Sequence, residues 1–157
     1  MNATIVKQLS THPFSRGMTP AHLNILTENA KTATWNTNDV IFREGQPANQ
    51  FYIINSGRVA LEAHEPGDGT VLVSTLEPGA VLGWSWLFPP FVWHFQARAV
   101  VPTELIELDA ARLLRTAEAD HDFGFELMKR LAQVVIQRLQ TTRKQLLQQQ
   151  IESALEG

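Results

Sequence analysis

Residues 39–61 read DVIFREGQPANQFYIINSGRVAL, and this stretch decides the fold. Its short runs of β-branched and aromatic residues, such as Phe51-Tyr52-Ile53-Ile54, have the composition of β-strands. Between the runs lie turn residues, with Gly45 and Gly57 at positions where a tight turn favours glycine. Short strands separated by such turns are typical of an antiparallel β-sheet domain. The stretch therefore predicts consecutive strands joined by tight turns.

The same pattern continues beyond this stretch. Further β-rich runs cover residues 71–76, 95–101 and 104–108. Pro66-Gly67-Asp68-Gly69, which lies before the first of these runs, is a predicted hairpin tip. We therefore expect about eight short strands between about residues 31 and 110. They would form an antiparallel β-roll of the jelly-roll or double-stranded β-helix type, in a mainly β domain with helices at both ends.

Helical patterns flank the β-rich region. Thr19 followed by Pro20 predicts the start of a short N-terminal helix, because a capping residue precedes a proline at the first helical position. A long C-terminal helix is predicted over about residues 120–150. Asp120-His121-Asp122 suits its start, since acidic residues are favourable at a helix N-terminus.

The apolar positions of the long helix alternate spacings of four and three, as in a two-stranded coiled coil. These positions are Met128, Ala132, Val135, Leu139, Thr142 and Leu146. At ~1.5 Å per residue the helix would be about 40 Å long, more than one small roll can cover, so we predict that it joins a homodimer. Packing against the chain's own roll is the alternative, and it is the preferred interpretation for Phe125, Leu127 and Leu131 near the start of the helix.

Length and composition indicate a single domain over residues 1–157. The chain is 44% hydrophobic, which is enough to bury a core. Its net charge is −3, so it lacks the basic character of a dedicated nucleic-acid binder. It contains no cysteine, which excludes disulfides and cysteine-ligated metals and suits a reducing compartment. No stretch approaches the ~20 apolar residues of a membrane span, so we expect a cytoplasmic protein without a membrane partner.

The order of these features resembles the cyclic-nucleotide-binding domain family. Residues 39–61 follow the family's order of an extended run, a glutamate-glycine turn, an aromatic strand and a glycine turn into the next strand. Gly79-Ala80-Val81-Leu82-Gly83 is similar to the glycine-framed start of the family's phosphate-binding cassette, and residues 103–109 are similar to its closing strand. The resemblance covers about residues 20–150. It implies a β-roll that binds a cyclic nucleotide, and a helix that corresponds to the dimer helix of catabolite-activator-like (Crp/Fnr-like) regulators.

The cassette departs from the family at the residues that hold the ligand. Trp84 stands where nucleotide-binding members usually have a glutamate for the ribose. Trp93 and His94 stand where an arginine and a serine or threonine usually hold the cyclic phosphate. Loss of one partner of a buried charged pair costs about 2 to 5 kcal/mol. We therefore expect ordinary cyclic AMP binding to be weak or absent, and we expect no other cofactor.

An aromatic segment replaces these ligand-binding residues. Three of the four tryptophans, Trp84, Trp86 and Trp93, fall within residues 82–95. They either line a pocket for an apolar or aromatic ligand, with serine and histidine side chains as polar groups, or plug it, and the plug is preferred for Trp86 alone. The candidate pocket residues are Gly83, Trp84, Ser85, Trp93, His94, Phe95 and Arg98.

Two of these candidates carry distinct expectations. Gly83 is expected to let the backbone approach a ligand phosphate. Arg98 offers a way to keep a nucleotide, because it could replace the missing arginine. If residues 95–101 form a regular strand, however, Arg98 lies on the opposite face from Trp93, and it would reach the pocket only through a bulge or a register shift.

Other functional classes lack their motifs. The five histidines are scattered, so no metal site is predicted, and no nucleophile elbow, Walker loop or dinucleotide fingerprint indicates catalysis. Five basic residues of the long helix are interpreted as a solvated face of the coiled coil: Lys129, Arg130, Arg138, Arg143 and Lys144. Regulators similar to this domain carry a helix-turn-helix module after the dimer helix, and the sequence stops at Gly157, so direct DNA binding is not expected.

These observations predict a non-catalytic sensor or regulatory module with a degenerate cassette. A small-molecule ligand in the cassette would shift the long helix and change a dimer surface that a protein partner reads. One alternative is a ligand-free scaffold for protein interaction, and a second is a cyclic-nucleotide sensor that uses Arg98. A cavity between Gly83 and Phe95 would favour the sensor, whereas a packed interior there would favour the scaffold.

Overall fold

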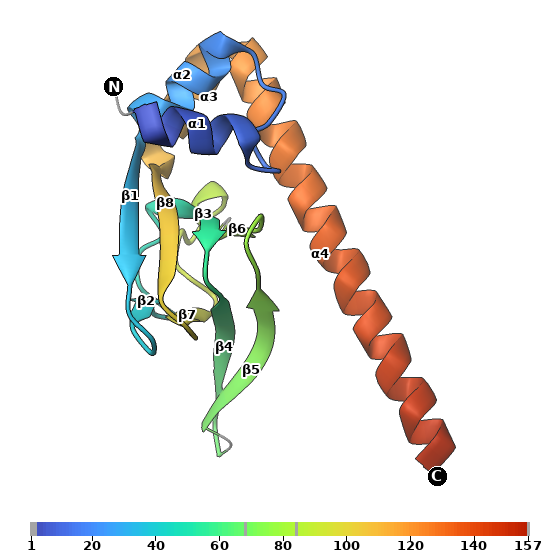
Figure 1. Cartoon of the computed structure of the whole chain (residues 1–157). Helices are drawn as coiled ribbons and strands as arrows, with labels where there is room; N and C mark the ends of the chain where they lie inside the picture. Colours follow the sequence, from blue (N-terminus) through green and yellow to red (C-terminus); the bar gives the residue numbers. More distant parts are fainter. Residues whose placement is uncertain (1–2, 68, 84, 157) are drawn as a thin grey trace.

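In the described part of the chain, two antiparallel sheets form a β-roll (Figure 1). The computed structural model describes residues 3–67, 69–83 and 85–156. The strands are β1 (Ala30–Trp35), β2 (Val40–Phe42), β3 (Gln50–Ser56), β4 (Val59–Glu65), β5 (Gly69–Leu76), β6 (Val81–Leu82), β7 (Gln96–Ala99) and β8 (Thr103–Asp109). One sheet has the order β1-β8-β3-β6, and the other has the order β2-β7-β4-β5.

The predicted mainly β fold with an antiparallel roll is confirmed. The strands begin at Ala30 and end at Asp109, close to the expected range of 31–110. β4 and β5 pair in antiparallel fashion along their length, as the predicted hairpin requires. Asp68, part of the predicted tip of this hairpin, lies outside the described residues.

Helices precede and follow the roll. They are α1 (Ala3–Thr11), α2 (Pro20–Glu28), α3 (Ala110–Ala119) and α4 (His121–Glu156), and a short 3-10 turn, η1 (Ser85–Leu87), follows β6. α2 begins as predicted, because Thr19 Oγ1 accepts a hydrogen bond from the backbone N–H of His22 at 3.3 Å. α1 and α3 are not among the predicted helices. α4 is the predicted long helix and continues past its expected end at Gln150.

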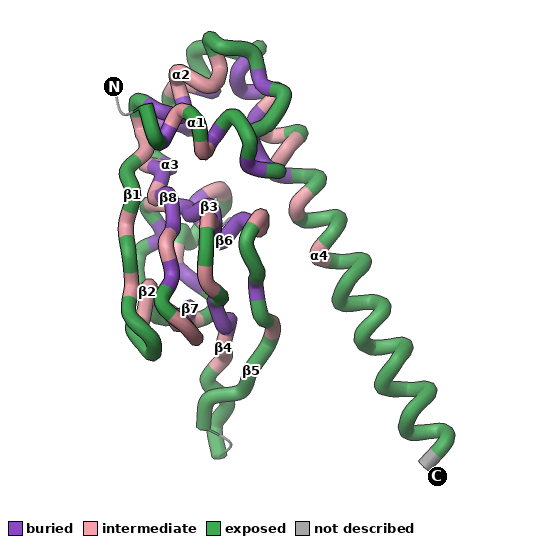
Figure 2. Tube along the Cα trace, in the orientation of Figure 1, coloured by how far each residue is buried: buried purple, intermediate pink, exposed green. Residues whose placement is uncertain are grey.

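The core lies between the two sheets and extends under α1 and α2 (Figure 2). Phe51 and Ile53 of β3 and Leu105 of β8 are among its largest fully buried side chains. Trp86 of η1 is buried as well, and its ring stacks on Phe51 with 5.2 Å between the centroids. Trp86 therefore belongs to the core, in agreement with its interpretation as a plug.

The first turns of α4 pack into this core. Asp120 caps the helix, because its Oδ1 accepts a hydrogen bond from the backbone N–H of Phe123 at 3.1 Å. Phe123, Leu127 and Leu131 are buried, and their spacing of four residues places them on one helix face. The packing expected for Phe125 is wrong, since its side chain is 69% exposed. Phe125 lies two residues from both Phe123 and Leu127, which turns it to the opposite side of the helix.

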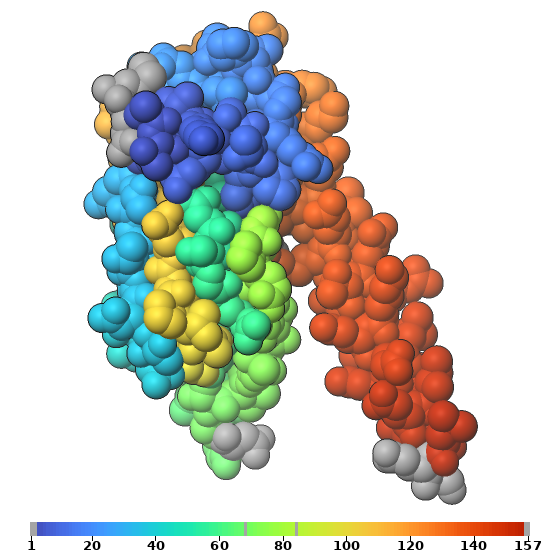
Figure 3. Space-filling view, in the orientation of Figure 1, coloured from blue at the N-terminus to red at the C-terminus, as the bar shows by residue number. Residues whose placement is uncertain are grey.

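The rest of α4 projects away from the roll, as Figures 1 and 3 show. Beyond Leu131 no described residue of α4 is buried. Exposed apolar side chains follow one side of the helix and form what we call the α4 stripe: Phe125, Ala132, Val135, Ile136, Leu139, Leu146 and Leu147. Of the remaining predicted coiled-coil positions, Met128 is half-buried and Thr142 is exposed. None of the described helices is both long and apolar enough to cross a membrane.

Candidate functional site

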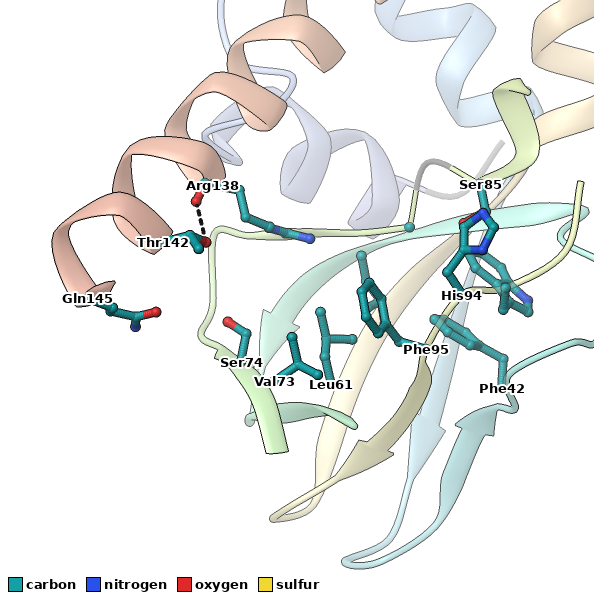
Figure 4. Close-up of a pocket in the computed structure, with 13 residues that line it drawn as sticks. Phe42, Leu61, Val73, Ser74, Ser85, His94, Phe95, Arg138, Thr142 and Gln145 are labelled. Atoms are coloured by element: carbon teal, nitrogen blue, oxygen red, sulfur yellow. Dashed lines mark hydrogen bonds between the residues drawn. The ribbon is translucent and has the colours of Figure 1, made fainter. Parts of the chain in front are cut away.

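A cavity of about 350 Å³ lies between the β-roll and α4 (Figure 4). The roll contributes Phe42, Leu61, Val73, Ser74 and Leu82 to its lining. The segment between β6 and β7 contributes Gly83, Ser85, Trp93, His94 and Phe95, and α4 contributes Arg138, Thr142 and Gln145. Its volume falls in the range of roughly 300–1,000 Å³ that is usual for small-molecule pockets. The cavity therefore occupies the place where the sequence predicts either a pocket or a plug.

Trp93 and Phe42 form a stacked aromatic pair in the lining of the cavity. Their ring centroids lie 3.8 Å apart, and the ring planes differ by 11°. Backbone hydrogen bonds hold the Trp93 segment in place, because Gly45 N–H donates to Trp93 O at 2.8 Å and Trp93 N–H donates to Gln46 O at 3.0 Å. Trp93 is only 5% exposed, so it both packs into the core and faces the cavity.

Gly83 makes this aromatic packing feasible. Its φ is +94°, a conformation that favours glycine, and a Cβ atom added to it would lie 2.5 Å from Cζ3 of Trp93. The sequence predicts that Gly83 leaves room for a ligand phosphate. In the structure the ring of Trp93 lies against Gly83, so the missing side chain serves protein packing.

The structure brings most of the predicted pocket residues together. Those that line the cavity are Gly83, Ser85, Trp93, His94 and Phe95. His94 and Phe95 are exposed at its rim, and Ser85 is half-buried in η1. Trp84 lies outside the described residues.

Arg98 does not line the cavity. Ala97 and Ala99 of β7 point into the core, and the alternation of the strand turns Arg98 to the outer face of the sheet. There its Nε lies 3.0 Å from Oε1 of Glu62, and its Nη1 donates to Asn38 Oδ1 at 2.9 Å. The hydrogen bonds from Arg98 lower the pKa of Glu62. Arg98 is therefore engaged on the side of the sheet that the sequence predicts for a regular strand.

Arg138 is one of several cavity residues that the sequence does not predict, and it is the charged one. Its Nη2 donates to the backbone oxygen of Val81 in β6 at 2.7 Å, and burial lowers its pKa to about 10. The interpretation of Arg138 as a solvated residue is thus wrong. The signal was its position seven residues after Leu131 and eleven after Leu127, which places all three on one face of the helix.

Arg130 also differs from the expected solvated residue. Its Nη1 donates to the backbone oxygens of Phe14 at 2.7 Å and Arg16 at 2.9 Å, while its Nε lies 2.6 Å from Oε1 of Glu126. These bonds tie α4 to the segment between α1 and α2. The start of α4 is therefore held by polar contacts as well as by its buried face.

The lining combines apolar surface with polar groups that can contact a ligand. Apolar walls meet the hydroxyls of Ser74 and Thr142, the amide of Gln145 and the cation of Arg138. Thr142 is at the same time a predicted coiled-coil position, so the cavity adjoins the surface where a second helix is expected. Among the described residues, no group of three or more histidine, aspartate and glutamate side chains could hold a metal ion.

Comparison with known proteins identifies relatives of this chain. A family model described as the cyclic nucleotide-binding domain matches residues 33–120, more than half of the chain. The CRP-like cAMP-activated global transcriptional regulator of Mycobacterium tuberculosis is 25% identical over 131 residues, which cover 83% of this chain and 57% of that protein. The acetyltransferase Pat of Mycolicibacterium smegmatis is 33% identical over 75 residues, or 48% of this chain and 22% of that enzyme. The chain thus spans little more than half the length of the first relative.

Solved structures share the fold. A putative cyclic nucleotide-binding protein from Geobacter metallireducens is 27% identical with a TM-score of 0.78, and the match covers 88% of this chain and 99% of that chain. A cyclic nucleotide-binding-like protein from Brucella abortus is 30% identical with a TM-score of 0.59, over 73% and 98% of the two chains. The catabolite activator protein of Thermus thermophilus, at 22% identity and a TM-score of 0.68 over 85% of this chain and 61% of that chain, shows likeness of fold alone.

Proposed function

This chain belongs to the cyclic nucleotide-binding domain family, and on that premise we propose that it is a non-catalytic sensor or regulatory module. In this proposal a small molecule occupies the cavity between the roll and α4 and changes the position of the helix. A protein partner then reads the changed surface. The cytoplasmic location expected from the cysteine-free sequence is part of the same proposal.

The cavity is the observation that carries this proposal. A packed interior between Gly83 and Phe95 would favour a scaffold, and the structure has about 350 Å³ of open space there. The lining combines the aromatic pair of Phe42 and Trp93 with polar groups from α4. Apolar walls with a few placed polar groups are typical of small-molecule sites.

We propose further that cyclic AMP is not held in the way that is usual for the family. Trp93 and His94 stand where the resemblance implies the phosphate-binding arginine and hydroxyl. The ring of Trp93 lies against Gly83, where the ligand phosphate would be expected. Arg98, which could have replaced the missing arginine, pairs with Glu62 on the outer face of the sheet. These contacts support weak or absent binding of cyclic AMP.

The proposed weak or absent binding of cyclic AMP is tested by calorimetric titration of the full chain with cyclic AMP up to millimolar concentration. We expect no saturable heat below the millimolar range, both for the natural sequence and for Arg98→Ala. Micromolar binding that Arg98→Ala abolishes would replace this proposal by a cyclic-nucleotide sensor that uses Arg98. Arg115→Ala is the matched control, because it removes an exposed arginine of α3 with the same change in net charge.

We propose that the module works as a homodimer joined along the α4 stripe. Val135 is 41% exposed and Leu139 is 67% exposed, which is unfavourable unless another surface covers them. Their heptad spacing fits a second copy of the same helix. Because Thr142 lines the cavity and continues the heptad pattern, a ligand would lie beside the dimer contact. This position supports coupling between ligand binding and the geometry of the dimer.

A ligand-free scaffold is the second candidate. The burial of Trp86 and Trp93 favours it, because both rings fill space that a ligand could occupy. The scaffold predicts that the cavity binds no small molecule. Binding of a fluorescent probe that a cavity-filling Ser74→Trp variant abolishes would therefore contradict it.

A role in transcription is a separate proposal. The Mycobacterium tuberculosis relative is named as a transcriptional regulator, and this chain spans 57% of its length. We propose for the present residues the sensor role in such an assembly, without direct contact to DNA. The net charge of −3 supports this, since DNA-binding domains usually carry a basic surface.

A further inference from the structure

Within the described part of the chain, the lining of the cavity contains basic but no acidic side chains. Among the described lining residues, Arg138 and His94 are basic and none is acidic. The other polar lining residues are neutral: Ser74, Ser85, Thr142 and Gln145. A concave site that contains a cation and no carboxylate attracts an anion. The cavity therefore differs from a purely apolar pocket.

Arg138 brings its positive charge into the cavity from α4. Figure 4 shows its side chain extending from the helix into the space beside Leu61 and Phe95. Its Nη2 donates to the backbone oxygen of Val81 at 2.7 Å, which fixes the direction of the guanidinium. Burial lowers the pKa of Arg138 to about 10, so the group is still charged at neutral pH. A guanidinium has five N–H donors, so it can donate to a ligand in addition to its protein partners.

The rest of the lining is largely apolar and aromatic. It includes the stacked rings of Phe42 and Trp93 and the side chains of Leu61 and Leu82. We infer that the cavity binds an organic anion with a flat apolar body, and that Arg138 of α4 is the residue that binds its anionic group. The inference rests on the proposed function, because it names the class of ligand for the same cavity.

Arg138 lies on α4, whereas the family's phosphate-binding arginine would lie in the cassette. Arg98, the arginine on β7 that could have replaced it, is paired with Glu62 on the outer face of the sheet. Arg138 belongs to α4, and its guanidinium contacts Val81 of β6. A ligand anion bound to Arg138 would therefore act at the junction of the helix and the roll. This is the place at which binding can change the direction of the helix.

Two dyes of different charge test the inference on the full chain. 8-Anilinonaphthalene-1-sulfonate is a flat apolar anion, and Nile red is a flat apolar molecule without charge. We expect the natural sequence to bind both dyes, with increased fluorescence. Arg138→Gln is expected to weaken binding of the sulfonate at least about tenfold, as loss of a buried charged contact does. Binding of Nile red should weaken much less, because only the freer helix and not the lost charge affects it.

Matched variants control for charge and folding. Arg115→Gln removes an exposed arginine from α3 and should leave the affinity for both dyes unchanged. Arg138→Lys keeps a cation at the same position and should retain most of the affinity for the sulfonate. If Arg138→Gln binds the sulfonate as tightly as the natural sequence does, the inference is overturned. If Arg138→Lys loses as much affinity for the sulfonate as Arg138→Gln does, and Nile red binding is lost as well, Arg138 has a structural role. That result would also contradict the inference.

A cavity-filling variant separates this inference from the proposed function. Ser74→Trp places a large side chain in the cavity from β5 and is expected to abolish binding of both dyes. If Ser74→Trp abolishes binding and Arg138→Gln has no effect, the cavity binds ligands but Arg138 does not bind their charge. If Ser74→Trp leaves both dyes bound, the dyes bind elsewhere, and the inference and the proposed function both fail.

Competition distinguishes between classes of anion. 1-Naphthoate, an aromatic carboxylate, is expected to displace the sulfonate dye from the natural sequence. Millimolar cyclic AMP is not expected to displace it. Displacement by micromolar cyclic AMP would still support an anion site at Arg138, but it would refute the proposed loss of cyclic AMP binding. Failure of 1-naphthoate to compete would count against a site for flat organic anions.

Discussion

Gly83 is the residue at which one added methyl group would most directly disturb the cavity. Its φ of +94° disfavours any other residue, and a Cβ atom there would lie 2.5 Å from Cζ3 of Trp93. We expect Gly83→Ala to lower the free energy of unfolding by more than the roughly 1 kcal/mol that a positive φ alone costs. The ring of Trp93 should also move. Denaturant unfolding measures the first effect, and near-ultraviolet circular dichroism measures the second.

Gly45→Ala is the matched control for this substitution. Gly45 has a similar φ of +87°, but an added Cβ would meet no atom within 4 Å. Gly45→Ala should therefore show only the cost of the backbone conformation. Equal losses of stability in the two variants would mean that the contact with Trp93 contributes nothing.

His12 is a buried histidine whose hydrogen bonds require its neutral form. Its Nδ1 accepts a hydrogen bond from the backbone N–H of Phe14 at 3.1 Å, so its Nε2 carries the proton and donates to Ile54 O at 3.1 Å. Burial lowers the pKa of His12, and the bond to Ile54 opposes this effect in part. Protonation of Nδ1 would place its N–H against the N–H of Phe14, so two donors would face each other. The charged ring would keep its bond to Ile54 O but could no longer accept from Phe14 N–H, so only the neutral ring makes both bonds.

We expect this histidine to make the protein less stable in mild acid. Below pH ~6.5 the unfolded chain binds a proton at His12 while the folded chain does not, so the free energy of unfolding falls as the pH is lowered toward the pKa of the folded state. The loss is at most about 1.4 kcal/mol per pH unit. Denaturant unfolding between pH 7.5 and 5 should show a shallower loss for His12→Gln than for the natural sequence. His64→Gln, at an exposed position, should keep the original slope, and an unchanged slope in His12→Gln would refute the assignment.

For single residues, the sequence could predict those roles that depend on neighbours close in the chain. Thr19 caps α2 and Trp86 lies in the core, as local composition indicates. The role of Gly83 could not be predicted, because it depends on where the ring of Trp93 lies in three dimensions. The role of Arg138 was equally hard to predict, since a basic residue on a long helix is usually solvated. The one sign that it faces the roll is that it shares a helix face with the buried Leu127 and Leu131.

Among the elements, α4 allows the clearest test. We expect Leu139→Glu to convert the proposed dimer into a monomer, because it places a charge in the middle of the α4 stripe. Burial of an unpaired charge in an apolar contact should raise the dimer Kd at least about a hundredfold. Analytical ultracentrifugation over a range of concentrations measures this change.

Thr141→Glu is the control for the charge itself. Thr141 is exposed and lies two residues from Leu139, so it is on the side of α4 opposite the stripe. This variant should remain a dimer. If Leu139→Glu and Thr141→Glu associate equally well, the stripe is not the dimer contact.

Long elements could be predicted from the sequence better than short ones. The strands of residues 39–61 and the long helix have strong patterns, and both are present. α3 carries a helical pattern, since Ala110, Leu113 and Ala117 lie on one buried face, yet it is not among the predicted helices. β6 has only two residues, too few for any periodicity. β6 forms because it pairs with β3, and sequence patterns do not record such pairing.

For the whole molecule, the relation between α4 and the roll can be measured directly. Because the chain contains no cysteine, spin labels can be placed at Glu65→Cys on β4 and Gln148→Cys on α4 alone. We expect Arg138→Gln to broaden the distribution of distances between the labels, since it removes the hydrogen bond from α4 to Val81. Double electron–electron resonance measures this distribution. Mixing labelled with unlabelled chains suppresses signals between two copies.

Arg115→Gln, measured with the same pair of labels, is the control. Arg115→Gln changes the net charge equally but lies on α3, and the distances should stay as in the natural sequence. A distribution that is as narrow in Arg138→Gln as in the natural sequence would show that the bond to Val81 does not hold the helix.

The sequence could predict a roll and a long helix, but not the cavity between them. The volume of the cavity depends on the angle at which α4 leaves the roll. That angle is set by contacts far apart in the sequence, such as those of Arg130 with Phe14 and Arg16. The candidate site could therefore be predicted only for its part in residues 83–95, and its parts on the strands and on α4 emerged from the fold.

The free length of α4 has a mechanical consequence. Leu131 is the last buried residue described in α4, and from there to Glu156 the helix extends about 37 Å, with Arg138 reaching the roll by its side chain. A tilt of about 5° around Leu131 as pivot would move the far end by about 3 Å. Arg138 lies about 10 Å from that pivot, so a small displacement of its backbone would be amplified about threefold at the end of the helix. The helix would thus act as a lever that converts a movement at the cavity into a larger one at its far end.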